Sequence, residues 1–142
     1  MIDQVIERLK AETSLRKVSG AKSLSRIMKD GRVPAGTHAA FVVPLGLTGG
    51  TSDAMAGIFS QNFSQTIGVI LMRNDFSSAH GSDSSDELQA DIDQTIGVLA
   101  GWAPTGALGV FTVGRGQLVA AQDTEVVYQL DFTIQNQLRI SR

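Results

Sequence analysis

The chain has 142 residues, of which 42% are hydrophobic and 18% are charged. These values are ordinary for a soluble globular protein with a single domain, residues 1–142, and they exclude a disordered chain. The sequence has no cysteine, which excludes disulfides, thiolate nucleophiles and cysteine metal sites. We expect no targeting segment and no membrane span, because the first ten residues are amphipathic and the longest apolar run, residues 67–72, is too short to cross a bilayer.

The charge is divided unevenly along the chain, although the net value is only −2. Residues 1–32 hold eight of the twelve lysines and arginines against four acids and carry +4. The remaining residues hold four basic side chains against ten acids and carry −6. Solvated helix faces explain this division. A second interpretation is that the two parts attract each other across a subunit boundary, whereas an isolated nucleic-acid-binding domain would more often show a basic excess.

The N-terminal part is predicted to contain two short helices. Apolar residues at helical spacing indicate an amphipathic helix over the first dozen residues. They are Ile2, Val5, Ile6 and Leu9. A brief extended segment ends at Gly20, and a second helix follows over residues 21–29, with Leu24, Ile27 and Met28 facing inward.

The next region combines a covered strand with a glycine-rich segment. Pro34 and Gly36 mark a turn before the apolar run of residues 38–45, a strand that Pro44 ends or places at an edge. Residues 46–61 are predicted to form a loop excursion, whose apolar side chains either fold back on the core or are covered by another subunit. These side chains are Leu47, Met55, Ile58 and Phe59.

A central strand and a long helix are predicted next. Residues 63–74 are β-branched and apolar on both parities near their middle, as in a strand covered on both faces. After a polar loop at residues 75–83, Ser84 and Glu87 match a capping box that would start a helix. Its inward stripe comprises Leu88, Ile92, Ile96 and Leu99, and residues 101–104 end it with Gly and Pro.

The C-terminal part is predicted to be β-structure. Residues 108–113 and 117–121 suggest two short strands joined by a hairpin turn at residues 114–116, with Arg115 at an exposed tip as a solubilising charge or a contact point. Residues 125–140 alternate apolar and polar side chains for nearly the whole run. At roughly 3.3 Å per residue this strand would span roughly 50 Å, well beyond the usual roughly 17–20 Å. We therefore expect its end, with Leu138 and Ile140, to lie at a subunit boundary.

Catalytic patterns are weak in this sequence. His38 and His80 have no second histidine or carboxylate at metal-binding spacing, and the serines near His80 lack a nucleophile elbow. Capping explains the acids that start the long helix, while Asp91 and Asp93 are assigned to its exposed face. No cofactor or enzymatic activity is expected. A small enzyme or ligand-binding domain, with residues 46–61 and 75–83 as site walls, is the less favoured alternative.

The order of these segments resembles the tail-terminator proteins of long-tailed bacteriophages. The likeness covers most of the chain and depends on order and spacing, because no single motif is diagnostic. The segments that carry it are IDQVIERLKAE, LRKVSGA, AAFVVPLG, FSQTIGVILMRN, LAGWAP and VVYQLDFTIQNQLR.

The resemblance implies an α+β fold, with a mixed or mostly antiparallel sheet packed by two or three helices. It implies a structural virion protein of the tail or neck, made in the host bacterial cytoplasm. Such a protein forms a ring, commonly hexameric, that caps the tail tube, stops its polymerisation and presents a head-joining surface. Implied partners are further copies, the tail tube protein and a head-completion connector, while genome DNA passes through the lumen without specific binding. A related neck or tail-completion connector is the alternative.

Contact surfaces between subunits are expected at two kinds of side chain. The first are apolar residues that one domain cannot easily cover, and the second are charges that could meet a complementary surface. The residues are Leu47, Met55, Ile58, Phe59, Asp86, Asp91, Asp93, Arg115, Leu138 and Ile140. Charge reversal within residues 86–93 is expected to weaken ring assembly more than stability.

Overall fold

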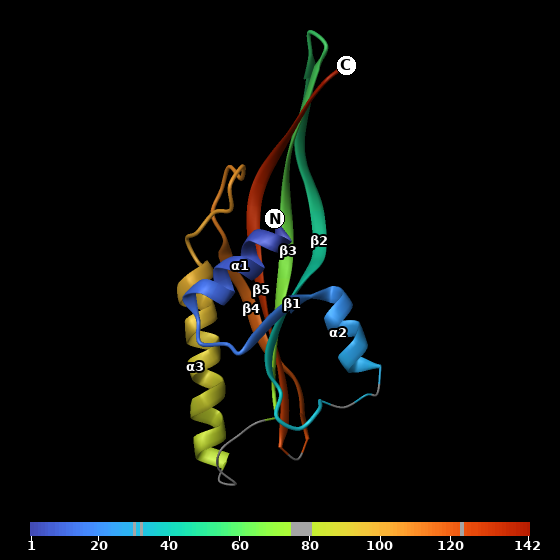
Figure 1. The fold of residues 1–142 in the computed structure, drawn as a ribbon. Coiled ribbons are helices and arrows are strands. Elements are labelled where there is room, and N and C mark those ends of the chain that lie inside the picture. Colours follow the sequence, from blue (N-terminus) through green and yellow to red (C-terminus); the bar gives the residue numbers. More distant parts are fainter. Residues whose placement is uncertain (30, 32, 75–80, 123) are drawn as a thin grey trace.

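The computed structural model describes residues 1–29, 31, 33–74, 81–122 and 124–142, with the backbone alone for residues 81–85. Residues 75–80 of the predicted loop at 75–83, with His80, lie outside the described residues, and residues 81–83 belong to the long helix. A five-stranded sheet is packed by three helices, which confirms the predicted α+β fold (Figure 1). The strands are β1 (Lys17–Gly20), β2 (His38–Met55), β3 (Ile58–Arg73), β4 (Thr112–Gln122) and β5 (Glu125–Ser141).

The sheet is mixed, with the order β1-β2-β3-β5-β4. Strand β1 runs parallel to β2, and the other pairs are antiparallel. The predicted central strand is β3, which pairs with β2 on one side and β5 on the other. Its apolar run explains this central position in the sheet, because the side chains of residues 67–72 are buried on both faces of the sheet.

Helices cover both faces of the lower part of the sheet (Figure 1). Helices α1 (Ile2–Glu12) and α3 (Gly81–Leu99) pack on one face, over a core that includes Val69 and Leu130. Helix α2 (Ala21–Met28) packs on the other face, against Phe41 and Ile70. The inward stripe predicted for the long helix is confirmed, since Ile92 and Leu99 are buried and Leu88 and Ile96 pack against the same core.

The bounds of the helices differ from the predictions in two details. Helix α3 begins at Gly81, so Ser84 lies in its first turn and the predicted capping box does not mark its start. Met28 was expected to face inward but is exposed, because it is the last residue of a helix of only eight residues. Gly101, with φ of 80°, follows the end of α3 as predicted.

The glycine-rich segment at residues 46–61 is not a loop. It forms the distal parts of β2 and β3, which pair from Gly46↔Thr66 to Met55↔Ile58. Ala56 and Gly57 alone form the turn, with φ of 53° and 79°. The glycines occupy places where the ladder shifts, since register changes occur between Pro44 and Gly46 and near Gly49 and Gly50.

The predicted hairpin at residues 114–116 is also wrong. These residues lie inside the single strand β4, where Arg115 pairs with Asp131 of β5. A register shift between Val113 and Arg115 leaves Gly114 as the extra residue of a bulge. Arg115 is therefore an exposed side chain on an edge strand and does not sit at a hairpin tip.

Candidate assembly surfaces

The sheet extends well beyond the helices as a three-stranded projection, which we call the arm (Figure 1). The arm consists of residues 46–55 of β2, 58–65 of β3 and 135–141 of β5. The C-terminus of the chain lies near its tip. The long final strand predicted from the sequence is thus confirmed as β5, and it is paired with β3 from Val126 to Ser141.

The two faces of the arm differ in polarity. Cross-strand partners share a face, and alternate residues along a strand share a face. Starting from the buried pair Ile67 and Phe132, the face that α1 and α3 cover in the lower sheet continues onto the arm as an apolar face. This apolar face carries Leu47, Phe59, Phe63, Leu138 and Ile140, with Gln61, Gln65 and Asn136 among them. The opposite face carries Thr48, Ser60, Asn62, Ser64, Gln135, Gln137 and Arg139, with Met55 and Ile58 at its tip.

Much of the apolar surface of the arm is open to solvent. Leu47 is 63% exposed and Leu138 is 41% exposed, while Met55 at the tip is 71% exposed. Phe59 and Ile140 are half-buried. The possibility that these side chains fold back onto the core is therefore wrong for Leu47 and Met55. Exposed large apolar side chains gathered on one projection are typical of a protein–protein contact.

The acids of α3 separate into one buried residue and two exposed ones. Asp86 and Asp93 are exposed, and Asp93 accepts a hydrogen bond of 2.9 Å from Nε2 of Gln89. Asp91 was assigned to the same exposed face, but it is only 3% exposed. That assignment is wrong, and Asp91 is not available to another subunit.

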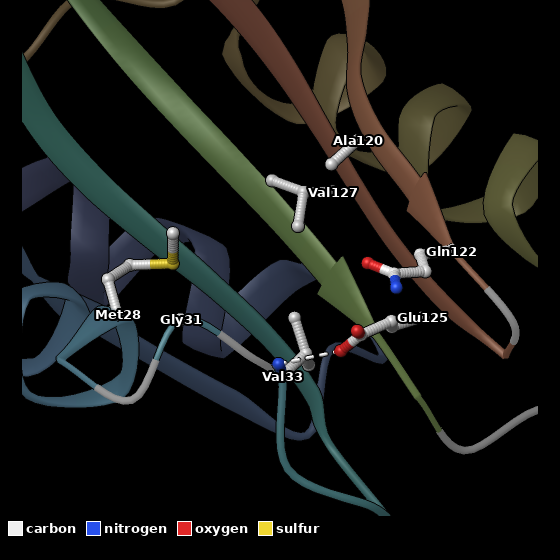
Figure 2. Close-up of a pocket in the computed structure, with 7 residues that line it drawn as sticks. All are labelled: Met28, Gly31, Val33, Ala120, Gln122, Glu125 and Val127. Atoms are coloured by element: carbon white, nitrogen blue, oxygen red, sulfur yellow. Dashed lines mark hydrogen bonds between the residues drawn. The ribbon is translucent and has the colours of Figure 1, made fainter.

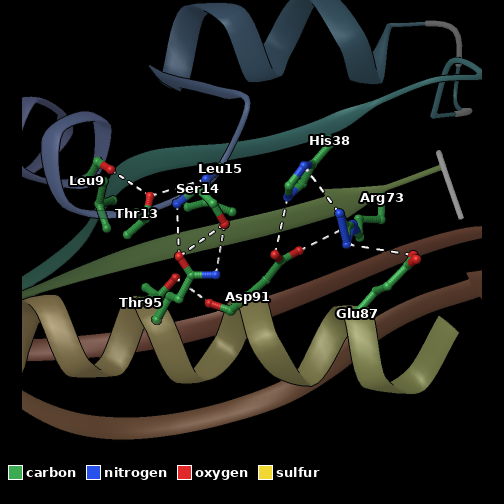
Figure 3. Close-up of polar contacts among 10 residues, drawn as sticks. Leu9, Thr13, Ser14, Leu15, His38, Arg73, Glu87, Asp91 and Thr95 are labelled. Atoms are coloured by element: carbon green, nitrogen blue, oxygen red, sulfur yellow. Dashed lines mark hydrogen bonds and ion pairs between the residues drawn. The ribbon is translucent and has the colours of Figure 1, made fainter. Parts of the chain in front are cut away.

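Asp91 belongs to a buried polar cluster at the end of the sheet (Figure 3). Its Oδ1 lies 3.2 Å from Nε2 of His38, and its Oδ2 lies 3.4 Å from Nε of Arg73. Nη2 of Arg73 lies 3.3 Å from Nδ1 of His38, and Nη1 lies 3.8 Å from Oε2 of Glu87. The guanidinium can only donate, so Nδ1 of His38 accepts and Nε2 donates to the carboxylate.

This cluster joins α3 to the sheet, because His38 begins β2 and Arg73 ends β3 and the two are ladder partners. Its signal was present in the sequence: Asp91 follows Leu88 by three residues and precedes Thr95 by four, which places it on the inward stripe of α3. Thr95 is also buried and donates to the carbonyl of Asp91 at 2.8 Å. Among the described residues, no group of three or more acids and histidines is arranged to hold a metal ion.

A small cavity lies beside the end of α2 (Figure 2). It has a volume of about 80 Å³, and at its rim the buried carboxylate of Glu125 accepts a hydrogen bond of 2.7 Å from the backbone N–H of Val33. Its lining residues are Met28, Gly31, Val33, Ala120, Gln122, Glu125 and Val127. Ligand sites usually measure about 300–1,000 Å³, so this cavity does not favour a small-molecule site.

Trp102 packs where the end of α3 meets α1. Its ring stacks on Phe111 with centroids 6.1 Å apart, and the guanidinium of Arg8 lies 4.8 Å above it. Nε of Arg8 also donates to the carbonyl of Val98 at 2.8 Å. Trp102 is half-buried and therefore closes the core at this point.

Comparison with known proteins supports the same class of molecule. A solved structure described as the virion of a native gene transfer agent particle contains a chain of similar fold, with a TM-score of 0.53 and 13% identity. The similarity covers 97% of this chain and 95% of that chain. At this identity the likeness concerns the fold alone. Among curated protein sequences, none matches the chain.

In the part of the chain that the structure describes, no helix has the length and apolar character needed to span a membrane.

The family model for phage tail terminator proteins matches residues 2–142, essentially the whole chain. The chain therefore belongs to the phage tail terminator family, a family of structural virion proteins.

Proposed function

We propose that the protein assembles as a ring, of six copies, that caps the phage tail tube, ends tube polymerisation and presents the surface that joins the tail to the head. The single observation that carries the proposal is the arm, whose apolar face continues the core face beyond the helices and is open to solvent. The partners would be further copies of the chain, the tail tube protein and a head-completion connector. Genome DNA would pass through the lumen without specific binding, and no cofactor is required.

The uncovered face supplies enough driving force for assembly. Burial of one large apolar side chain contributes about 1.5–3 kcal/mol. This face offers Leu47, Phe59, Leu138 and Ile140, while Met55 and Ile58 add exposed apolar surface at the tip on the opposite face. Covering even half of them would contribute several kcal/mol per contact, part of which offsets the entropy lost on association.

We propose that the next subunit of the ring covers this face. The arm projects from one end of the molecule, and the helices lie at the other, so a contact between an arm and the helical end of a neighbour joins two different surfaces (Figure 1). Contacts between unlike surfaces repeat from copy to copy and close into a ring when the rotation allows it. Arg115, exposed on the edge strand β4, remains a proposed contact of the same assembly.

Tail length tests the proposal. Phage that lacks the gene would be complemented with the wild-type chain or with a Leu47→Ser/Leu138→Ser variant. A Thr48→Ala/Gln137→Ala variant, which alters the polar face of the same strands, is the matched control. We expect tails of uncontrolled length without the gene and with the apolar-face variant, and uniform tails with the wild-type and control chains, all measured by electron microscopy.

Two results would contradict the proposal. Tails of normal length in the absence of the gene, combined with unjoined heads, would favour a neck or tail-completion connector. A strictly monomeric protein that is absent from particles would end the structural interpretation altogether.

A further inference from the structure

Helix α3 presents an exposed stripe with one sign of charge. Asp86 and Asp93 are seven residues apart, which places them on one side of the helix about 10.5 Å from each other along its axis. Gln89 lies between them on the same exposed side. The sequence of α3 contains no lysine or arginine.

Helix α2 presents the opposite charge over the same length. Lys22 and Arg26 are exposed, and Lys29, which follows the last residue of the helix in helical conformation, is exposed as well. Lys22 and Lys29 are also seven residues apart, so they too are separated by about 10.5 Å. The sequence of α2 contains no acid.

The helix dipole favours Arg26 and Lys29 at the C-terminal end of α2, but it does not explain Lys22 or Asp93. Lys22 lies in the first turn of α2, where the dipole disfavours a cation, and Asp93 lies in the middle of α3. Residues three or four apart on a helix are neighbours, so Lys22, Arg26 and Lys29 repel one another. Helix α1, in contrast, mixes its charges, and Lys10 lies 3.6 Å from Glu7.

The two stripes cannot meet within one molecule. Helix α3 packs over the core on one face of the sheet, and α2 packs over the other face (Figure 1). Only a second copy can therefore bring an acidic stripe to a basic one.

We infer that neighbouring subunits meet with α3 of one against α2 of the next, so that Asp86 and Asp93 face Lys22, Arg26 and Lys29. We call this contact the charged seam. The inference rests on the proposed ring, because it specifies which surfaces join its subunits. The contact is head-to-tail, as a closed ring requires. Nucleic acid on the basic stripe is the competing occupant, and the experiments below separate the two.

A charge exchange tests the seam. One variant carries Asp86→Lys/Asp93→Lys, a second carries Lys22→Glu/Arg26→Glu, and a third combines all four changes. Like charges placed against each other oppose association strongly, so we expect each reversal alone to reduce the protein bound to phage tails by about tenfold or more. The combined variant should recover most of the binding, because the opposite charges face each other again. Glu7→Lys/Glu12→Lys on α1 is the control for the first variant, with an equal charge change on a mixed surface.

Cross-linking gives an independent readout, because the chain has no cysteine of its own. Ser25→Cys on α2 and Ala90→Cys on α3 place one thiol beside each stripe, at exposed positions. A short bismaleimide linker should convert the doubly substituted protein into a ladder of products that ends at the closed ring. Either single variant should stop at a dimer. The experiment would be run on purified protein and on isolated particles.

The results distinguish failure of the seam from failure of the proposed function. If the combined variant binds no better than the single reversals, and the doubly substituted protein forms no ladder in either preparation, the seam is wrong even where the wild-type chain controls tail length. If the Lys22→Glu/Arg26→Glu variant binds phage tails like the wild type but no longer binds DNA, the basic stripe binds nucleic acid and the seam is overturned. A ladder formed by a protein that does not control tail length would support the seam and remove the proposed function.

Discussion

At the scale of single residues, the cluster around Asp91 determines how firmly α3 is held. Asp91, His38 and Arg73 come from three elements and lie within 3.2–3.4 Å of one another. All three are largely removed from solvent, with side-chain exposures of 4%, 6% and 11%. A charge at such a site is tolerated because its partners are fixed around it.

We predict that Asp91→Ala destabilises the protein by about 3–5 kcal/mol, the usual cost of removing one member of a buried ion pair. Urea unfolding followed by circular dichroism measures the loss. Asp93→Ala, two residues away on the exposed side, should change the free energy of unfolding by no more than about 0.5 kcal/mol. If the Asp91→Ala chain unfolds like the wild type but no longer assembles, Asp91 acts at a subunit contact and the prediction is wrong.

The same cluster illustrates what a sequence can predict. The apolar stripe of α3 was read from its leucines and isoleucines, and the structure confirms it. Asp91 lies on that stripe but was assigned to solvent because of its charge, since a carboxylate is rarely buried without partners. Its partners His38 and Arg73 are far away in the sequence and meet it only through the pairing of β2 with β3. The spacing therefore indicated the direction of the side chain, and only the sheet register supplied the reason for its burial.

At the scale of elements, the glycines of the arm explain why a long hairpin was predicted to be a loop. A Cβ on Gly50 would lie 3.0 Å from the backbone oxygen of Asn62, and one on Gly49 would lie 2.9 Å from the side chain of Gln61. Gly50 therefore permits a close approach of neighbouring strands at a bulge, whereas the contact at Gly49 is with the end of a flexible side chain. Glycine marks turns and bulges alike, so composition alone could not distinguish a loop from an irregular strand.

The turn of the arm gives a prediction at this scale. Ala56 and Gly57 both have positive φ, as the two central residues of a type I′ turn require. Alanine disfavours this conformation, whereas asparagine tolerates it. Ala56→Asn should therefore stabilise the arm by up to about 1 kcal/mol, measured as slower amide hydrogen exchange in residues 52–61. Ala56→Val, which is branched at Cβ, should accelerate exchange in the same residues. Equal exchange in both variants would contradict the assigned turn.

At the scale of the whole molecule, the chain presents two contact surfaces that differ in physical character. The apolar face of the arm stabilises a contact by burying apolar side chains away from water, and the strength of that contact depends little on moderate salt. The stripes of α2 and α3 work through exposed charges, whose attraction is screened over about 10 Å at 0.1 M salt and about 3 Å at 1 M. The net charge of −2 conceals this division, because the opposite stripes nearly cancel.

Salt dependence should therefore separate the two contributions. Exposed ion pairs contribute about 0.2–1 kcal/mol each, so screening of the seam should weaken self-association several-fold between about 0.1 M and 1 M salt. Asp86→Asn/Asp93→Asn should reduce association at low salt and flatten its dependence on salt, because the screened charges are gone. Leu47→Ser should reduce association at every salt concentration and leave the slope unchanged. Sedimentation of the purified variants across the salt series measures both effects. If the neutralised variant kept the wild-type slope, the charges that respond to salt would lie elsewhere, and the acidic stripe would be an ordinary solvated helix face.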